Sequence, residues 1–213
     1  MIHYLLSIRG GSLKVSEIRI IQSVLGDFIG RVWFVFLLSC WRKARSLFKN
    51  TKWDLESGPE TRFVKRLALA AAMYRELTLK FGRETAFDIV QRIVVQIGFE
   101  EQSVNASQMR GTWDTEFSRL DAFHNLMDEK GGPRFNTRTF LQRDRNLCHF
   151  RVTRCVFYDF FSSIDVPELT KLFCEVDRVF FTTEFPSVKF HRNGSWENTI
   201  AFGKDFCEFI FEA

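Results

Sequence analysis

The sequence lacks three features that would assign it quickly to a class of protein. It has no run of five or six basic residues and no Cys-x-x-Cys pair, and its strongest apolar run, Val32 to Cys40, is about half of the roughly 20 residues that a membrane span needs. Met1 to Ile8 lacks the basic start, apolar run and cleavage site of a signal peptide. These absences argue against a nucleic-acid-binding tail, a common zinc motif, a membrane span and secretion.

Charge and aromatic content leave the partner open but do not favour nucleic acid. The chain has 30 basic and 26 acidic residues, a net charge of +4 that is compatible with a small anionic substrate. Its 25 phenylalanines are concentrated after Phe117, and we interpret this enrichment as core packing. An aromatic platform for single-stranded nucleic acid would need Arg and Lys interleaved along one exposed strand, a pattern that the sequence does not show.

The five cysteines are an odd number, so they cannot all pair within one chain. With no signal to carry the chain to an oxidising compartment, the sequence predicts reduced thiols in the cytoplasm. The cysteines are Cys40, Cys148, Cys155, Cys174 and Cys207.

Residues 1–56 are predicted to form a helical N-terminal arm. Ser12 or Ser16 is a candidate cap for a helix whose apolar residues recur every three or four positions as far as Phe28. The following stretch, Val32 to Leu38, is apolar on every face, so we predict that it is buried against another subunit or against the helices that follow. The arm therefore favours a homo-oligomer or a lid.

Residues 57–213 are predicted to form a second, α+β domain, which begins at the break Ser57-Gly58-Pro59-Glu60. Two helices joined at Gly82 make a helical hairpin, and one further helix precedes Gly131. The predicted fold class is α+β, with the N-terminal helices and the hairpin packed on a C-terminal antiparallel sheet. The elements expected after Gly131 are a strand over 147–155, a helix from Pro167 to Phe180, hairpin strands over 188–191 and 195–201 around Asn193-Gly194, and a final strand over 207–211.

Three segments in the second half resemble one family of hydrolases. They are 152–155 with 159–161; 167–169 running into 173–177; and 188–192 with 199–203 and 207–209. Their order, spacing and residue types resemble the L-2-amino-thiazoline-4-carboxylic acid hydrolase family, over roughly residues 60 to 211. The resemblance implies a small-molecule substrate and hydrolytic opening of a cyclic, amidine-like thiazoline. Where the family pattern ends Cys-Asp-Phe-Arg-Phe, Glu208 and Ile210 replace Asp and Arg, so that the expected Arg contact with a substrate carboxylate is missing.

Attack on a C=N carbon needs a nucleophile or an activated water, a proton donor and groups that hold the tetrahedral intermediate. A cysteine beside a cation is the strongest nucleophile near neutral pH, and Arg154 adjoins Cys155. His149 lies six residues before Cys155, about 20 Å along a strand, so their pairing would need a bulge. His191 on another strand is an equal candidate for the base. Substrate binding is assigned to Thr153, Cys207 and His149.

Cys174 and Asp177 form a second candidate pair. They stand three residues apart on one predicted helix and so share a face. Asp177 is expected to pair with Arg154, and a structural salt bridge accounts for both residues as well as catalysis does. The nucleophile stays open between Cys155 and Cys174, with Asp177 as acid, base or orienting group.

Two other readings remain open from the sequence. Cys155, Cys174 and Cys207 could hold zinc, although no cofactor is the expectation. The chain could instead be a non-enzymatic ligand-binding or adaptor module with a Phe-rich pocket, or its buried cysteines could be small core residues. Thiol alkylation should abolish turnover in an enzyme and spare ligand binding in an adaptor.

Overall fold

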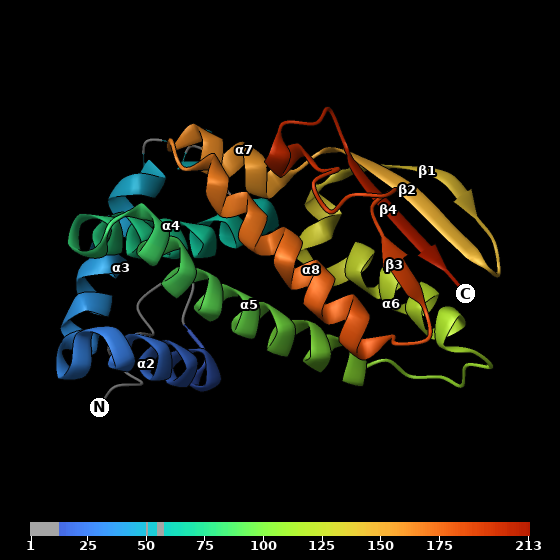
Figure 1. Ribbon diagram of the computed structural model, residues 1–213, viewed down its shortest axis with the longest axis horizontal. Coiled ribbons are helices and arrows are strands. Elements are labelled where there is room, and N and C mark those ends of the chain that lie inside the picture. The colour runs from blue at the N-terminus through green and yellow to red at the C-terminus, as the bar shows by residue number, and fades with distance from the viewer. Residues whose placement is uncertain (1–12, 50, 55–57) are drawn as a thin grey trace. The chain divides into compact units, whose positions relative to one another are not determined.

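The computed structural model describes residues 13–49, 51–54 and 58–213. The chain in Figure 1 divides into two compact units, and each unit consists of two segments that are separate in sequence. The first, here called the helical unit, comprises the described residues up to Ile97 together with Phe160–Leu169. The second, the sheet unit, comprises Gly98–Asp159 and Thr170–Ala213. The predicted boundary at residues 56 and 57 stays a prediction, and Ser12, Ser57 and the segment 1–8 lie outside the described residues.

The arm contains two helices, α2 (Val15–Ile29) and α3 (Trp33–Lys49), joined by a short 3-10 turn over Gly30–Val32. Gly30 has a φ of 58°, a left-handed conformation that favours glycine at this corner. Ser16 is not the cap, because α2 begins after Lys14, whose backbone N–H donates to Glu17 Oε2 at 2.8 Å. By length and apolar composition alone, the segment Val15–Lys49 would suffice to cross a membrane, and 33% of its most apolar window is buried.

One face of α3 packs on α4 (Pro59–Phe81), and it is made by Leu37, Cys40, Ala44 and Phe48. Of the stretch Val32 to Leu38, Leu37 is thus buried within the chain, and burial of the other residues against another subunit stays a prediction. Val32 and Val35 are 55% and 68% exposed, because they lie on the opposite side of the helix.

The predicted pair of helices around Gly82 is confirmed. Gly82 has a φ of 83° and separates α4 from α5 (Arg83–Ser107). The end of α7 (Val156–Ser163) and the 3-10 turn Pro167–Leu169 complete the helical unit.

Polar contacts fix the segment Phe160–Leu169 to α4. Tyr74 Oη donates to Glu168 Oε1 at 2.9 Å, and Arg75 donates to the carbonyl oxygen of Ile164. A segment distant in sequence is thus part of the helical unit.

The sheet unit contains a four-stranded antiparallel sheet with strand order β1-β2-β4-β3. The strands are β1 (Thr137–Arg143), β2 (Leu147–Arg154), β3 (Lys189–His191) and β4 (Cys207–Glu212). The expected strands at β2, β3 and β4 are confirmed, as are the helices α6 (Glu116–Lys130) and α8 (Thr170–Glu184) and the α+β fold class.

The predicted hairpin strand over 195–201 is wrong, because β3 pairs with β4 instead. After β3, Asn193 and Gly194 take φ values of 49° and 87°, and the Asn198 side-chain amide donates to the carbonyl oxygens of Arg192 and Asn193 at 2.8 Å each. The loop is thus closed by a side chain and leads into the 3-10 turn Ile200–Phe202.

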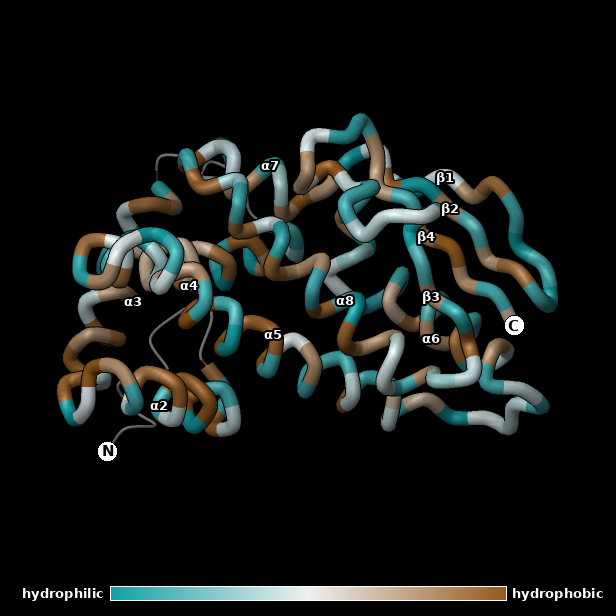
Figure 2. Tube along the Cα trace, viewed as in Figure 1, coloured by the Kyte–Doolittle hydropathy of each residue, from teal (hydrophilic) through white to brown (hydrophobic). Residues whose placement is uncertain are grey.

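Side chains alternate between the two faces of the sheet, and in β2 buried residues alternate with more exposed ones; Figure 2 shows the hydropathy along the strands. One face packs on α6 and α8 in a core of mutually contacting Phe rings, which confirms core packing as the role of these aromatics. In that core the Phe150 and Phe209 rings stack at 4.8 Å, and Phe123 meets Phe180 at 4.9 Å. The other face carries His149, Arg151 and Glu208 at the centre of the sheet.

Candidate active site

Helix α8 positions Cys174 and Asp177 one turn apart, as the spacing predicted. The Cys174 thiol lies 4.0 Å from Thr199 Oγ1, a hydroxyl that is fully buried in the loop before β4. The next residue in that loop, Ile200, donates its backbone N–H to Cys207 Sγ at 3.3 Å. The loop therefore connects a thiol of α8 to a thiol at the start of β4.

Cys155 is the third thiol of this group, which we call the thiol cluster (Cys155, Cys174, Cys207). Cys155 lies between β2 and α7, and its carbonyl oxygen accepts from Asp159 N at 3.0 Å in the first turn of α7. A negative charge on Cys174 or Cys207 raises the pKa of Cys155, so the three sulfurs lie within electrostatic reach of one another. Three thiols distant in sequence thus lie in the same region of the sheet unit.

Burial controls the ionisation of these thiols. It raises the pKa of Cys155 and of Cys174 to about 12 each and raises that of Cys207. For Cys155, backbone N–H groups at the start of α7 act in the opposite direction, and for Cys174 the Arg192 guanidinium does so. All three sulfurs are therefore protonated thiols at neutral pH in the free protein.

Asp177 forms an ion pair with Arg192, with Oδ2 3.2 Å from Nη2. The predicted pairing of Asp177 with Arg154 is wrong, because Arg154 Nε donates to Asp159 Oδ2 at 2.8 Å. Burial raises the pKa of Asp177 to about 6, although the Arg192 charge and hydrogen bond act to lower it. The carboxyl side chain keeps 27% of its surface exposed, whereas that of Arg192 keeps 1%. Asp177 is therefore the accessible member of the pair and titrates close to neutral pH.

Arg192 is held on several sides. Its guanidinium carbon lies 4.0 Å from the centre of the Phe209 ring, and Nη1 donates to the Glu208 carbonyl oxygen at 3.3 Å. Within the part of the chain that the structure describes, its buried Nε–H has no hydrogen-bond partner. Fixed in this way, Arg192 orients the Asp177 carboxylate beside the thiol cluster.

The remaining predicted site residues lie elsewhere. His149 Nε2 lies 2.9 Å from Glu208 Oε1 on the opposite face of the sheet, and His191 Nε2 lies 3.5 Å from Glu212 Oε1. Thr153 is exposed near the end of β2. The structure thus does not bring these three residues to the thiol cluster.

The missing family Arg at position 210 falls on the opposite side of β4 from the cluster. Ile210 pairs with His149 and His191 and so belongs to the other face, whereas Cys207 and Phe209 face the core. Arg192, which the sequence interpretation did not select, supplies the cation at the cluster. Arg192 lies in the family-like segment 188–192, which could have indicated its role.

In the described ranges 13–49, 51–54 and 58–213, no group of three or more His, Cys, Asp or Glu residues has the geometry to hold a metal ion. The thiolate zinc site considered from the sequence has no geometric support among those residues. What the site offers is acid–base chemistry: three protonated thiols, one carboxyl group with a pKa near neutrality and a buried guanidinium.

The α+β fold holds a carboxyl group and three thiols that hydrolysis of a small molecule could use. A family model for L-2-amino-thiazoline-4-carboxylic acid hydrolase matches residues 61–211, and the chain belongs to that family. A comparison with curated proteins finds no match. Among solved structures, the chain is similar to an H-NOX protein from S. oneidensis crystallised in the Fe(II)NO ligation state, with 13% identity over 94% of this chain and 98% of that chain and a TM-score of 0.41.

Proposed function

We propose that this protein is a cytoplasmic hydrolase that opens a small ring at a C=N carbon bonded to both nitrogen and sulfur, as in 2-amino-thiazoline-4-carboxylate. The observation that supports the proposal is the Asp177 carboxyl group, whose pKa is raised to about 6 beside the thiol cluster. A general base is most effective when its pKa lies near the working pH. The family name gives the class of substrate.

In the proposed first step, Asp177 accepts a proton from water as the water oxygen bonds to the C=N carbon. The electron pair of the C=N bond moves to the ring nitrogen, which takes up a proton. The tetrahedral intermediate then loses its C–S bond, and the sulfur leaves as a thiol with the proton of the new hydroxyl group as that group becomes the carbonyl. The proton held by Asp177 replaces the one that was given to the ring nitrogen. Ring opening therefore consumes one water molecule and needs no oxidant or reductant.

The thiols act in this scheme as proton donors and not as preformed thiolates. Transfer of a proton from Cys174, with a pKa of about 12, to Asp177, with a pKa of about 6, spans about six pH units. Such a transfer is therefore unfavourable. Water attack assisted by Asp177 avoids that separate ionisation, and a neutral Cys174 thiol can donate to the developing charge.

The test is turnover of 2-amino-thiazoline-4-carboxylate by the wild type and by single variants, with a melting curve for each preparation. Asp177→Asn should lower kcat by about a hundredfold or more, because it removes the base. In the wild type, kcat should rise with pH through about 6, since the carboxylate is the active form. An Asp177→Asn variant as active as the wild type would contradict the proposal.

Substitutions of Cys174 distinguish a proton donor from a nucleophile. Cys174→Ser keeps a proton donor and should retain measurable turnover, whereas Cys174→Ala should lose most of it. If Cys174 were the nucleophile, both variants would be inactive. Cys40→Ser is the matched control, because Cys40 is a buried cysteine of α3 in the other unit, outside the family match.

A further inference from the structure

The excess positive charge of the protein lies in the arm. Between Val15 and Lys49 the chain has six basic residues and two acidic ones, out of 30 and 26 in the whole chain, which leaves 24 of each elsewhere. The net charge of +4 therefore comes from α2, α3 and the turn between them. The six basic residues are Arg19, Arg31, Arg42, Lys43, Arg45 and Lys49.

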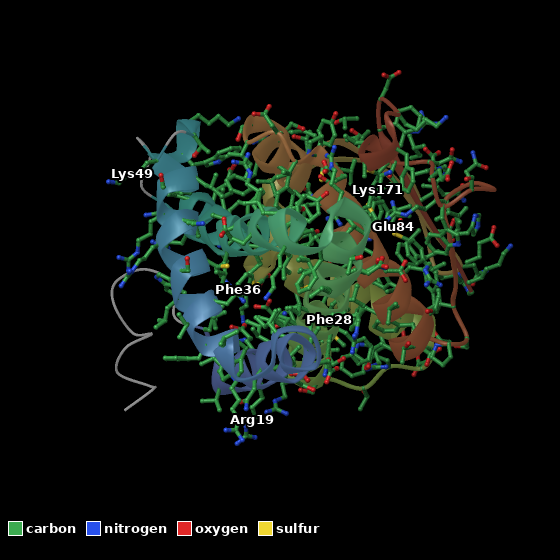
Figure 3. The ribbon with its side chains drawn as sticks, turned by 60° about the vertical axis from the view of Figure 1, so that its left-hand side comes forward. Arg19, Phe28, Phe36, Lys49, Glu84 and Lys171 are labelled. Atoms are coloured by element: carbon green, nitrogen blue, oxygen red, sulfur yellow. The ribbon has the colours of Figure 1, made fainter. Side chains whose placement is uncertain are left out.

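Three of these basic residues lie on the same side of α3 as a row of apolar residues. Val35, Arg42 and Lys49 are spaced by seven residues, so they lie above one another on the helix. With Val32, Leu38 and Arg45 they form what we call the α3 stripe, opposite the face that packs on α4. Its first half is apolar and its second half is basic, and Figure 3 shows Lys49 extending outward from the end of α3.

The two acidic residues between Val15 and Lys49 do not neutralise the α3 stripe. Glu17 is buried and pairs with Arg66 of α4 at 2.9 Å, and Asp27 of α2 lies 3.4 Å from Arg92 of α5. The α3 stripe itself contains no acidic residue. Its apolar and cationic side chains are thus exposed or half-buried, and within residues 13–49, 51–54 and 58–213 no ion pair involves Arg42, Arg45 or Lys49.

We propose that the α3 stripe docks on a lipid bilayer surface rich in anionic headgroups. Val32 and Val35 enter the boundary between headgroups and acyl chains, and Arg42, Arg45 and Lys49 contact the headgroups. The half-buried rings of Phe34, Phe36 and Trp41 border the stripe and suit the same boundary, where aromatic side chains are enriched in membrane proteins.

Charge and packing favour this occupant over the alternatives. A second copy of the α3 stripe would bring more basic residues and no acidic partner, which disfavours a symmetric contact. A membrane span would separate α3 from α4 and break the Glu17–Arg66 and Asp27–Arg92 ion pairs. Contact with a bilayer surface keeps all of these interactions.

The experiment is co-sedimentation of the full chain with vesicles of phosphatidylcholine alone or with phosphatidylserine added. The wild type should bind only the anionic vesicles and should be released by added salt. The variant Arg42→Glu/Arg45→Glu/Lys49→Glu should lose at least about a hundredfold in partition, since each Lys or Arg near an anionic surface contributes about fivefold.

The matched control is Arg110→Glu/Lys130→Glu/Lys204→Glu, which makes the same change in net charge at exposed positions of the sheet unit. It should bind anionic vesicles within a few-fold of the wild type. Val32→Asn/Val35→Asn should weaken binding at least tenfold at unchanged net charge and melting temperature.

Three results would overturn the proposal. The first is a wild type that does not bind anionic vesicles. The second is an equal loss of binding in the control triple variant, which would assign the effect to net charge alone. The third is a wild-type dimer that the α3 stripe variants dissociate while vesicle binding is unchanged, which would identify a second copy as the occupant. The hydrolase activity is measured separately on soluble substrate, so its presence or absence does not decide the outcome.

Discussion

At Asp177, burial opposes ionisation more strongly than Arg192 favours it, and this has a consequence for stability. The folded pKa of about 6 lies above the model value of 3.8, so the folded state binds the proton more tightly than the unfolded state. The stabilising contribution of this group is full below about pH 4 and is lost as the pH rises to about 6. By linkage the loss is about 3 kcal/mol.

We therefore predict that Asp177→Asn, which cannot ionise, is more stable than the wild type at pH 7 by up to about 3 kcal/mol and equally stable near pH 4. Urea unfolding of both proteins between pH 4 and 7.5 measures this difference. A variant less stable than the wild type at pH 7 would mean that Asp177 serves mainly to neutralise Arg192. A gain in stability with a loss of turnover is typical of a residue kept for function.

His124 of α6 has the opposite pH dependence. Its ring is enclosed by Phe150, Phe181 and Phe211, and burial lowers its pKa to about 3, with Arg138 and Arg143 acting in the same direction. Because the folded state excludes the proton, the contribution of His124 is full above pH 6.5 and is lost as the pH falls toward 3.

The wild type should lose about 1.4 kcal/mol of folding stability per pH unit below pH 6.5, and we expect His124→Phe to remove this loss. The Phe ring suits the aromatic surroundings, and it removes the buried Nε2 atom, which has no partner among the described residues. Urea unfolding at pH 7.5, 6 and 5 would show a flatter dependence in the variant. Parallel curves for the two proteins would show that His124 does not set the acid sensitivity.

At the scale of elements, α5 and α8 approach each other closely at Gly98 in the sheet unit. A Cβ placed on Gly98 would lie 2.7 Å from both methyl carbons of Val176. Val176 adjoins Asp177, so this contact helps to set the position of the helix that carries the carboxyl group and Cys174.

We predict that Gly98→Ala destabilises the protein by about 1–3 kcal/mol, despite the better helix propensity of Ala, because a branched side chain cannot move aside easily. Adding Val176→Ala should recover part of the loss in thermal melting. Gly26→Ala in α2 is the control: its Cβ would meet nothing within 4 Å, so it should stabilise by about 0.5–1 kcal/mol. Equal effects of the two substitutions would rule out the proposed clash.

The elements also differ in how far the sequence could predict them. The helices around Gly82, and the strands β2 and β4, follow from periodicity and a glycine in the left-handed conformation. Strand β1 was missed because nearly all of it is exposed and its pairing with β2 is irregular, so no alternating pattern marks it. The error over 195–201 has a related cause: Asn193-Gly194 is a hairpin signal, but β4 already occupies the pairing edge of β3.

The candidate site, too, could be predicted only in part from the sequence. Cys174 and Asp177 were predictable from helical spacing, and Cys155 and Cys207 from their place in the family-like segments. The Asp177–Arg192 pair was not, because it depends on which face of the sheet each residue occupies after β3. Arg154 was chosen as the cation of the site because it adjoins Cys155 in sequence, but it pairs with Asp159.

For the whole molecule, the division into units does not follow the order of the chain. The last residues of α5, from Gly98 to Ser107, belong to the sheet unit, where Phe99 meets Phe180 at 6.3 Å. Phe160–Leu169 in turn belongs to the helical unit, through the contacts of Tyr74 and Arg75. The helical unit therefore includes a segment from the second half of the chain, and the sheet unit includes the end of a helix whose first residues belong to the helical unit.

The exchange of segments predicts how the protein behaves once its backbone is cut. Arg110 lies in an exposed loop between α5 and α6, a site open to trypsin. Cleavage there leaves two fragments, each holding a piece that the other needs to complete its core. We expect the nicked protein to elute from a sizing column at its original position and to separate only in denaturant. Expressed as separate halves, the fragments should reassemble as split reporter proteins do, whereas neither half alone should fold.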